Sequence, residues 1–479
     1  MTNATVAIIG GGFSGTVAAI RLLSSPQRNG PSLPFGSKIV LIEPGRAGEG
    51  LAYRAGPDYW RLNVPAERMS AFPEHPNDFL DFARARNPLV SGGDFLPRSW
   101  YGDYLSDRLE LARRRSPRWL AFERVRARAT AIDVARASAR IWLDDGAVID
   151  ADRVLLALGN SPVPAPLPGA REVVADAWNL RWMEKLPTYV PRVLLVGTGL
   201  TMIDIALAIA TMRPDVRMTA ISRHGLLPQP HEGATHLPAT NFDAAALLGH
   251  GPLSERLRRF RAQVVASGGD WRAALQQVRD VMPALWRAAP RRLRRRFLRH
   301  LRCYWDAHRH RVPAETAKKI ATLREKKKLD VRAGRIVETR RIKDGVVVAW
   351  RARGSEAVRE DLFDAVINVT GPDGDPGRSP CPLVQSLMDQ ALCEPDGLGL
   401  GWGTDADGRL FDANASAPGV LYYIGPLLRA RHWEATAVPE LRTHVARTTS
   451  ALVSSLATGA GSYIRRFAMP MFRREQPSF

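Results

Sequence analysis

Short apolar runs that end at turn residues recur along the chain and predict buried strands. Residues 6–9 precede a glycine-rich loop, residues 38–43 end on an acid, and residues 192–196 precede a second loop with glycines. A continuous apolar run of this length is typical of a parallel sheet that is covered on both faces. The remaining runs of this kind are residues 153–159, 216–222, 346–350, 365–371 and 419–425.

Helical segments separate these predicted strands. Residues 16–23 contain helix formers without glycine or proline, and residues 436–457 predict a helix near the C-terminus. Residues 255–329 are basic and mostly helical in composition, with expected breaks at Pro283, Pro290 and Pro313. The order strand, glycine loop, helix, strand occurs twice. This order predicts an α/β fold with two Rossmann-like dinucleotide-binding domains and a mostly helical basic insertion.

The length of the chain also indicates two domains. Its 479 residues exceed what one core supports, because cores stop growing at about 250–300 residues. We expect residues 1–165 and 355–479 to form the first domain, and residues 166–354 the second, with a helical insertion at about 250–330. Residues 161–169 are rich in proline and predict a linker. A cleft between the domains is the expected ligand site.

The first glycine loop matches the dinucleotide fingerprint G-x-G-x-x-G. Its glycines allow a tight turn, close approach of a pyrophosphate, and close packing of the helix on the strand. Glu43, at the end of the next strand, is the candidate for binding the ribose hydroxyls, although it lies 28 residues after Gly15 rather than about 20. A glycine turn without a ligand is the alternative. The loop residues predicted to bind FAD are Gly10, Gly12, Phe13, Ser14 and Gly15.

The second glycine loop is predicted to bind NADPH through Gly197, Gly199, Leu200 and Thr201. Met202 occupies the position of the third glycine, which weakens the match. Arg223 lies 21 residues after Met202, where a carboxylate would favour NADH. A guanidinium there suits a 2′-phosphate, so NADPH is preferred. The alternative is that Arg223 is a surface charge at a strand end.

The net charge of +20 favours anionic partners. Basic residues concentrate between 287 and 328, and we interpret them as a solvated helix face. A nucleic-acid patch is the alternative, but no nucleic-acid motif accompanies the run, so no such partner is expected. The cysteines, Cys303, Cys381 and Cys393, form no C-x-x-C pair, so neither a redox dithiol nor a metal site is predicted.

The N-terminal segment lacks a basic region and a cleavage site, so no signal peptide is predicted. The most apolar long stretch, residues 193–210, contains glycines and Asp204 and does not predict a membrane span. Together with the cysteine pattern, these features lead us to expect a cytoplasmic protein. The oligomeric state is not predicted.

A set of motifs supports a family resemblance. They are residues 10–15, 50–53, 62–66, 69–70, 97–98, 101–105, 197–201, 222–228, 368–372, 425–426 and 433–442. On these motifs the chain resembles bacterial FAD/NAD(P)-binding proteins that include flavin-dependent amino-acid N-hydroxylases, notably the nitrosuccinate-forming aspartate N-monooxygenase type. It is more distantly similar to lysine and ornithine N-hydroxylases. The resemblance covers most of the chain except residues 255–329.

The resemblance implies where the flavin of FAD lies. Gly425 and Pro426, with the helix that starts near Thr436 and Ala437, lie against the flavin in this reading. That helix start could present N–H groups to the pyrimidine edge of the flavin. The resemblance also implies that Asn63 and Met69 lie near the isoalloxazine ring. No other catalytic residue is predicted, because the flavin itself carries the chemistry.

For several polar residues, the sequence allows either a functional or a structural role. Arg54 and Arg98 are candidates for binding a substrate carboxylate or the FAD phosphates, or are surface arginines. His231 and His236 follow the second glycine unit and are catalytic candidates or structural histidines. One departure from flavin monooxygenases is that a Phe-x-Gly signature with a following histidine is not visible between residues 168 and 186.

The leading hypothesis is an FAD-dependent, NADPH-consuming monooxygenase. It would use O2 and a flavin hydroperoxide to N-hydroxylate a small amine or amino acid. A second hypothesis is an NADPH-dependent flavin reductase or dehydrogenase that transfers no oxygen, although the lack of C-x-x-C argues against disulfide reduction. A third is a flavin-binding regulatory protein that docks through its basic helices, for which salt-dependent DNA binding would be the sign.

Overall fold

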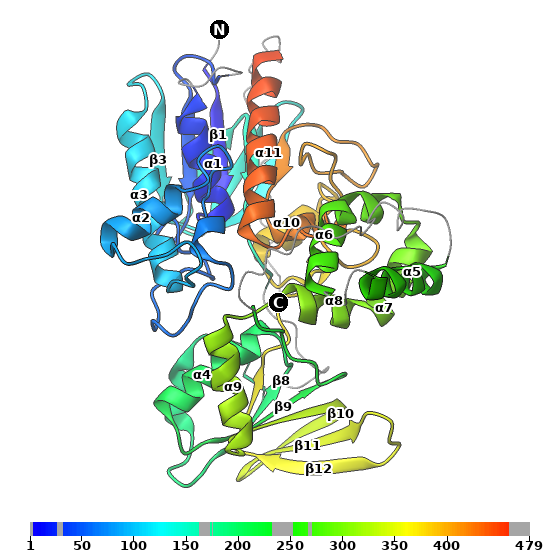
Figure 1. The fold of residues 1–479 in the computed structure, drawn as a ribbon. Helices are drawn as coiled ribbons and strands as arrows, with labels where there is room; N and C mark the ends of the chain where they lie inside the picture. Colours follow the sequence, from blue (N-terminus) through cyan, green and yellow to red (C-terminus); the bar gives the residue numbers. More distant parts are fainter. Residues whose placement is uncertain are drawn as a thin grey trace, which may run out of the picture.

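The computed structural model describes residues 3–25, 32–161, 173–174, 176–231, 252–266 and 271–458. Most of the expected linker at 161–169 lies outside the described residues, as does His236. Figure 1 shows two lobes joined by a narrow region, with a group of helices at one side. We define the first lobe as residues 3–161 and 373–458, the second lobe as residues 176–231 and 312–368, and the helical insertion as residues 252–309.

A five-stranded parallel sheet forms the centre of the first lobe, in the order β14-β7-β1-β2-β3. Its inner strands are apolar at nearly every position, because helices and other chain segments cover both faces. In the register, Ile9 lies beside Ile42 on one side and Leu156 on the other. The strands are β1 (Thr5–Ile9), β2 (Lys38–Ile42), β3 (Ala121–Val125), β7 (Arg153–Leu156) and β14 (Leu421–Tyr423).

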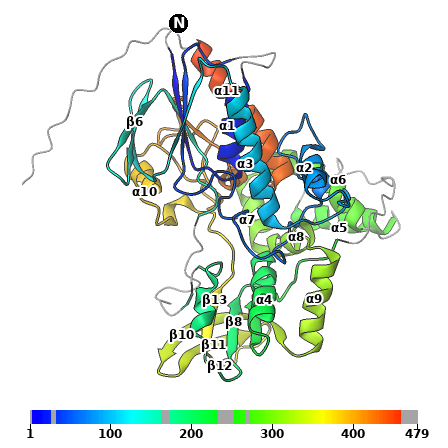
Figure 2. The same ribbon diagram turned by 90° about the vertical axis from the view of Figure 1, so that its left-hand side faces the viewer.

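Helices α1, α3 and α11 lie side by side on one face of this sheet, as Figure 2 shows edge-on. The other side carries an antiparallel three-stranded sheet, β4-β5-β6, and helix α10. The helices are α1 (Phe13–Leu23), α2 (Asp78–Arg86), α3 (Arg98–Arg115), α10 (Pro382–Asp389) and α11 (Val438–Thr458), with short 3-10 helices at Ala66–Arg68, Pro376–Arg378 and Pro426–Ala430. The three strands are β4 (Ala129–Val134), β5 (Ala139–Leu143) and β6 (Val148–Ala151).

The second lobe is built on a six-stranded sheet in the order β12-β11-β10-β9-β8-β13. Strands β13, β8, β9 and β10 are parallel, while β11 and β12 form an antiparallel extension. Helices α4 (Leu200–Met212) and α9 (Ala314–Glu325) pack together on it, and a 3-10 helix spans Leu180–Lys185. The strands are β8 (Arg192–Val196), β9 (Arg217–Ser222), β10 (Leu329–Ile342), β11 (Gly345–Ala352), β12 (Val358–Phe363) and β13 (Ala365–Asn368).

The second sheet extends past the expected boundary at residue 354. Strand β13 pairs in parallel with β8, and β12 pairs with β11, so the chain leaves this sheet only after Asn368. An apolar-run criterion does not detect β12, which is a charged edge strand, and it detects β13 without showing to which sheet β13 belongs.

The helical insertion packs against the first lobe, although the chain enters and leaves it from the second. Its helices are α5 (Leu253–Ala266), α6 (Trp271–Ala288), α7 (Arg291–His300) and α8 (Arg302–Arg309). The indole N–H of Trp286 donates to the Ala430 carbonyl at 2.9 Å, and its ring stacks on Trp433 at 4.7 Å. At the base of the insertion, the Val312 N–H donates to the Gln229 carbonyl and the Val312 carbonyl accepts from the His231 N–H, so the outgoing and returning segments lie side by side.

Pro290 and Pro313 immediately precede α7 and α9, as expected of helix-starting prolines. The expected break at Pro283 is wrong, since this proline lies inside α6. Proline removes one backbone hydrogen bond, but Met282 and Trp286 are buried on either side of it. Their burial favours continuing the helix. Across the described part of the chain, no helix has the length and hydropathy needed to cross a membrane.

Candidate active site

The first glycine loop connects β1 to α1 and has the geometry of a dinucleotide loop. Gly10 adopts φ +101°, and a Cβ on Gly15 would overlap the Gly10 carbonyl oxygen, so α1 can pack here only with glycine. Phe13 and Ser14, both buried, begin α1. No side chain caps the helix at Gly12 and no acid lies in its first turn, so the N–H groups there can bind an anion.

Glu43 lies beside this loop despite its long sequence spacing. One carboxylate oxygen accepts from the Gly11 N–H at 2.6 Å, and the other from the Gly45 N–H at 2.9 Å. Because β1 and β2 are adjacent parallel strands, the residue after β2 reaches the loop that follows β1. The carboxylate is therefore held where a ribose-binding acid of this fold lies.

The second glycine loop, between β8 and α4, repeats this local structure. Gly197 adopts φ +121°, and a Cβ there would lie 2.6 Å from the Val369 carbonyl oxygen. A Cβ on Gly199 would meet nothing within 4 Å, so the space in front of the loop is open to a ligand. Leu200 and Thr201 begin α4, again without a side-chain cap. The departure at Met202 is accommodated because this side chain is fully buried in the core of the second lobe.

Arg223 directly follows β9, next to the second loop. The Gly197 N–H donates to the Ile221 carbonyl at 2.8 Å, and the Thr198 and Ser222 hydroxyls lie 2.8 Å apart. The side chain of Arg223 is exposed. Its position, one strand along from the glycine loop, is the one from which a residue of this fold reads the adenosine ribose.

The loop that carries Asn63 and Met69 is fixed between three parts of the chain. The Asn63 carbonyl oxygen lies 3.1 Å from Nε2 of His231, which comes from the second lobe. Arg442, on α11, donates to the Ser70 carbonyl at 2.8 Å, directly after the buried Met69. Burial, with nearby arginines in support, lowers the pKa of His231 to about 4, so the ring is neutral at pH 7 and can donate through Nε2.

The segment between β14 and α11 contains the other flavin-side candidates. Gly425 adopts φ +140° and precedes the 3-10 helix that starts at Pro426. Thr436 and Ala437 are half-buried and come just before α11. This helix starts two residues later than the sequence predicts. Because α11 packs against α1, these residues and the first glycine loop belong to the same side of the first sheet.

Arg54 and Arg98 line one small pocket at the junction of the lobes, together with Trp60 and Trp178. Its volume is about 10 Å³, roughly the room for one water molecule. Arg98 donates to Asp204 on α4 at 2.7 Å and to the Arg61 carbonyl at 3.0 Å. Burial raises the pKa of Asp204, and the charge of Arg98 opposes that shift. Arg98 therefore joins the two lobes.

A buried charge network fixes the helical insertion to the segment before α11. Glu434 accepts from Arg309 at 2.6 Å and from the Trp305 indole at 3.0 Å. Arg279 and Arg309 both donate to Glu440 in the first turn of α11, at 2.7 and 3.2 Å. Sequence reasoning missed this network and missed Asp204. A lone acid in the otherwise apolar α4 was the available signal, because a buried charge requires a partner.

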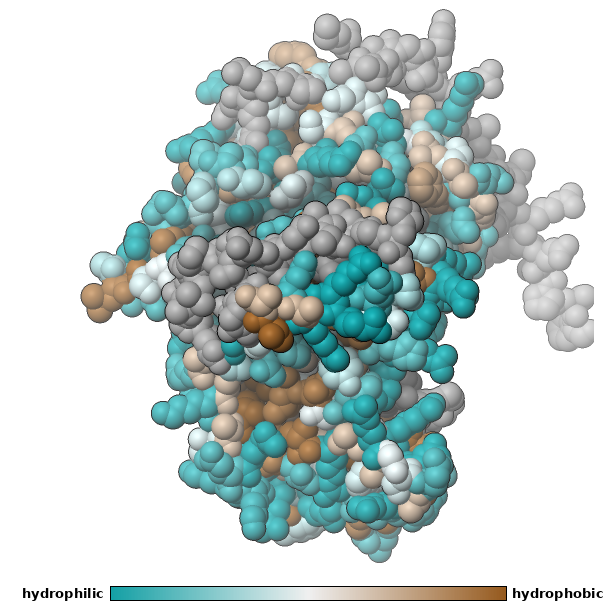
Figure 3. Space-filling model, turned by 45° about the vertical axis from the view of Figure 1, so that its right-hand side comes forward, coloured by the Kyte–Doolittle hydropathy of each residue, from teal (hydrophilic) through white to brown (hydrophobic). Residues whose placement is uncertain are grey.

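The predicted site residues thus fall into two groups. Glu43 and the first glycine loop form one cluster, while Arg223 and the second glycine loop form the other, one in each lobe. Asn63, Met69, Arg54 and Arg98 lie on first-lobe segments that contact the second lobe or α11. In Figure 3, hydrophobic residues gather mainly in a hollow in the lower half of the view, on a face that is otherwise largely hydrophilic. No cluster of potential metal ligands is found within the described ranges.

Fold and site together define an α/β protein with two dinucleotide-type glycine loops. Residues 7–161 match the family model of FAD-NAD(P)-binding proteins. No curated protein sequence matches the chain. Among solved structures, the chain is similar to the ornithine hydroxylase of Pseudomonas aeruginosa, with 15% identity and a TM-score of 0.64, covering 95% of this chain and 100% of that one.

Two further structures show the same arrangement. An ornithine N-hydroxylase from Kutzneria sp. 744, with reduced FAD, NADP+ and L-ornithine, is 17% identical with a TM-score of 0.61, covering 96% of this chain and 100% of that one. Thioredoxin reductase from Lactococcus lactis is 11% identical with a TM-score of 0.52, covering 95% of this chain and 100% of that one. The predicted fold class, with two Rossmann-like domains, is confirmed.

Proposed function

We propose that the protein is an FAD-dependent, NADPH-consuming monooxygenase that uses O2 to N-hydroxylate a small amine or amino acid. The observation that carries the proposal is the pair of equivalent glycine loops, one in each lobe, each followed by a helix whose N-terminus no side chain caps. The similarity to ornithine hydroxylases over nearly the whole chain supports the same assignment, because it includes both lobes and their order.

In this proposal the first lobe binds FAD and the second lobe binds NADPH. The first lobe corresponds to residues 1–165 and 355–479 of the expected division, less the strands β12 and β13. FAD contacts Gly10, Gly12, Phe13, Ser14, Gly15, Glu43, Asn63, Gly425, Pro426, Thr436 and Ala437. NADPH contacts Gly197, Gly199, Leu200, Thr201 and Arg223.

When bound, FAD would supply the redox chemistry that links NADPH oxidation to oxygen transfer from O2. The chain binds both nucleotides and holds the loop of Asn63 and Met69 in place through His231 and Arg442. It also joins the two lobes through the ion pair of Arg98 and Asp204. The proposed reaction requires no acid–base pair in the protein.

For the substrate we propose an amino acid with a carboxylate side chain, as in the aspartate N-monooxygenase type. Arg54 lines the pocket beside Arg98, whose charge is already paired with Asp204, and a guanidinium group suits a carboxylate of the substrate. That pocket holds about one water as it stands, so substrate binding has to widen it. We also propose a cytoplasmic location, which the free state of Cys303, Cys381 and Cys393 supports.

The experiment is anaerobic reduction of the FAD-loaded protein by NADPH or NADH, followed by reoxidation in air with a panel of amines and amino acids. We expect faster reduction by NADPH, and an N-hydroxylated product formed in step with NADPH consumption for one substrate class. NADPH consumption that yields only hydrogen peroxide with every compound would support the reductase instead. A purified protein that binds no flavin would refute both enzyme hypotheses and leave the regulatory one.

A further inference from the structure

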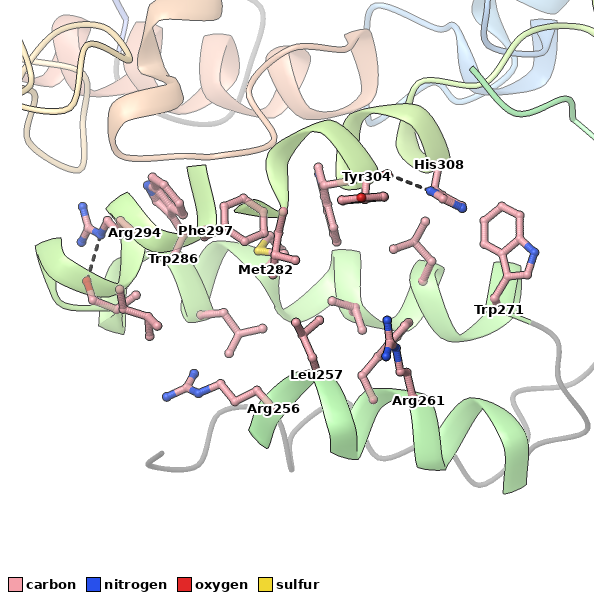
Figure 4. Close-up of a pocket in the computed structure, with 18 residues that line it drawn as sticks. Arg256, Leu257, Arg261, Trp271, Met282, Trp286, Arg294, Phe297, Tyr304 and His308 are labelled. Carbon is pink, nitrogen blue, oxygen red and sulfur yellow. Dashed lines mark hydrogen bonds between the residues drawn. The ribbon is translucent and has the colours of Figure 1, made fainter. Parts of the chain in front are cut away.

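The helices of the insertion line a partly open pocket of about 630 Å³, well within the range of small-molecule sites. Helix α6 supplies one wall, because its apolar residues recur at helical spacing along its whole length. Figure 4 shows side chains from α5, α7 and α8 closing on this wall, with Trp271 at one end and Trp286 at the other. Phe297 and Met282 lie between them.

The charged groups at the pocket are all of one sign. Arg256, Arg261 and Arg294 line it, and none of the described lining residues is an Asp or Glu. In Figure 4, Arg261 extends from α5 towards α6, whereas Arg294 lies at the opposite end near Trp286. The guanidinium of Arg294 lies 5.3 Å from the Trp286 ring and donates to the Ala289 carbonyl, so it is held at the edge of the apolar wall.

We propose that this pocket is a second binding site, separate from the dinucleotide loops, for a small amphiphile with an apolar chain and a carboxylate or phosphate head. The chain lies along α6 and the head pairs with an arginine at the rim. Burial of the apolar chain supplies most of the affinity. The guanidinium groups supply the preference for an anion.

Other occupants fit less well. The C-terminal segment 459–479 is aromatic enough to enter an apolar pocket, but it carries Arg465, Arg466, Arg473 and Arg474, which the arginines of the rim repel. The substrate of the proposed reaction is small and polar, whereas the pocket is lined by indole, phenyl and aliphatic groups. In the basic helix α7, Arg294 lines the pocket, whereas the other arginines of the helix are exposed.

The test is isothermal titration of the full-length protein with dodecanoate below its micelle concentration. Dodecyltrimethylammonium and dodecanol serve as the cationic and neutral comparisons. We expect one dodecanoate per chain, bound at least about tenfold more tightly than the cation. Equal affinity for the two charged probes, or a titration that does not saturate, would overturn the proposal. So would binding to phosphatidylglycerol vesicles without binding of monomeric dodecanoate, because that result assigns the basic surface to a membrane.

Two variants locate the ligand. Leu257→Trp fills the pocket from α5 and should weaken dodecanoate binding about tenfold or more. Arg261→Gln should reduce the preference for the anion while retaining dodecanol, and Arg258→Gln, an exposed arginine of the same helix, should change neither. Circular dichroism and thermal unfolding check that each variant is folded. If correctly folded Leu257→Trp binds dodecanoate as the parent does, the ligand lies elsewhere and the proposal is wrong.

Discussion

The carboxylate of Glu434 and the guanidinium of Arg309 lie 2.6 Å apart, and each side chain is less than a tenth exposed. The pair joins α8 of the helical insertion to the segment that leads into α11. A buried pair adds little net stability relative to an apolar pair, because both charges lose water. Removing one partner lowers the free energy of unfolding substantially, because the other charge is left in the protein interior.

Arg309→Met should therefore destabilise the protein by about 3–5 kcal/mol. The reason is that Glu434 would lose its nearest cation and retain only the Trp305 indole and the more distant Arg279, 3.7 Å away. Urea unfolding followed by tryptophan fluorescence measures the change. Glu110→Gln is the control, because the partners of Glu110, Arg113 and Arg114, lie on an exposed helix face. A similar small effect for both variants would show that the buried network does not hold the insertion.

The ion pair of Arg98 and Asp204 predicts a pH-dependent variant. Arg98→Met removes the charge that opposes desolvation, so the already raised pKa of Asp204 should rise further. A carboxyl whose pKa is raised in the folded state does not lower the free energy of unfolding while it is protonated. The cost therefore appears as the pH rises through the folded pKa. The stability of Arg98→Met relative to the parent should fall as the pH rises from about 4, the unfolded pKa of an aspartate, towards neutral pH.

Chemical unfolding across that pH range checks this prediction. The double variant Arg98→Met/Asp204→Asn serves as the control, since it has no carboxyl to titrate at this position. A pH-independent difference between Arg98→Met and the parent would contradict the assignment.

The two glycines of the second loop should respond differently to the same substitution. Gly199→Ala places a methyl group in open space in front of the loop. We expect a native thermal midpoint but NADPH binding weakened about tenfold or more, because the pyrophosphate has to approach there. Gly197→Ala instead forces φ +121° on an alanine and should cost about 1–3 kcal/mol of stability. Normal NADPH binding by Gly199→Ala would remove this loop from the nucleotide site.

Arg223→Gln should lower the preference for NADPH over NADH. The expected change in the ratio of kcat/KM values is about tenfold, the worth of one charge-assisted hydrogen bond to a phosphate. Arg217→Gln, at the exposed start of the same strand, is the matched control. An unchanged ratio for Arg223→Gln would mean that another residue reads the 2′-phosphate.

Half-buried histidines predict a loss of stability in mild acid. Burial, with nearby positive charge, lowers the pKa of His444 to about 4 and that of His432 to about 3; His231 is likewise lowered, to about 4. Unfolded histidines have a pKa of about 6.5, so the unfolded chain takes up protons that the folded chain does not. Stability should fall as the pH drops below about 6.5, with part of the slope removed by His444→Phe. A flat stability curve from pH 7 to pH 5 would contradict these environments.

Local sequence patterns predicted the parts of the fold that are buried on both faces. Strands β1, β2 and β8 are nearly continuous apolar runs, because parallel strands inside an α/β sheet meet no water. Strand β12, with the sequence VREDLF, was not predicted, since an edge strand can be charged.

The site shows the same division between local and long-range features. The glycine loops follow from local backbone geometry, and each lies where its motif predicts. The pairs that join the lobes and the insertion connect residues more than 100 positions apart, such as Arg98 with Asp204. No local pattern encodes which partner a buried charge finds, although an isolated acid in an apolar helix shows that a partner has to exist.

The helical insertion begins and ends at the paired segments around Gln229 and Val312 in the second lobe, and it packs against the first lobe. A large rotation of one lobe relative to the other would therefore break the contact between the insertion and the first lobe. It would separate Trp286 from Trp433 and expose both indoles. A large rotation between the lobes therefore has a high free-energy cost in this protein. We expect nucleotide exchange to proceed by local opening at the rim of the cleft, with the relative orientation of the lobes nearly constant through turnover.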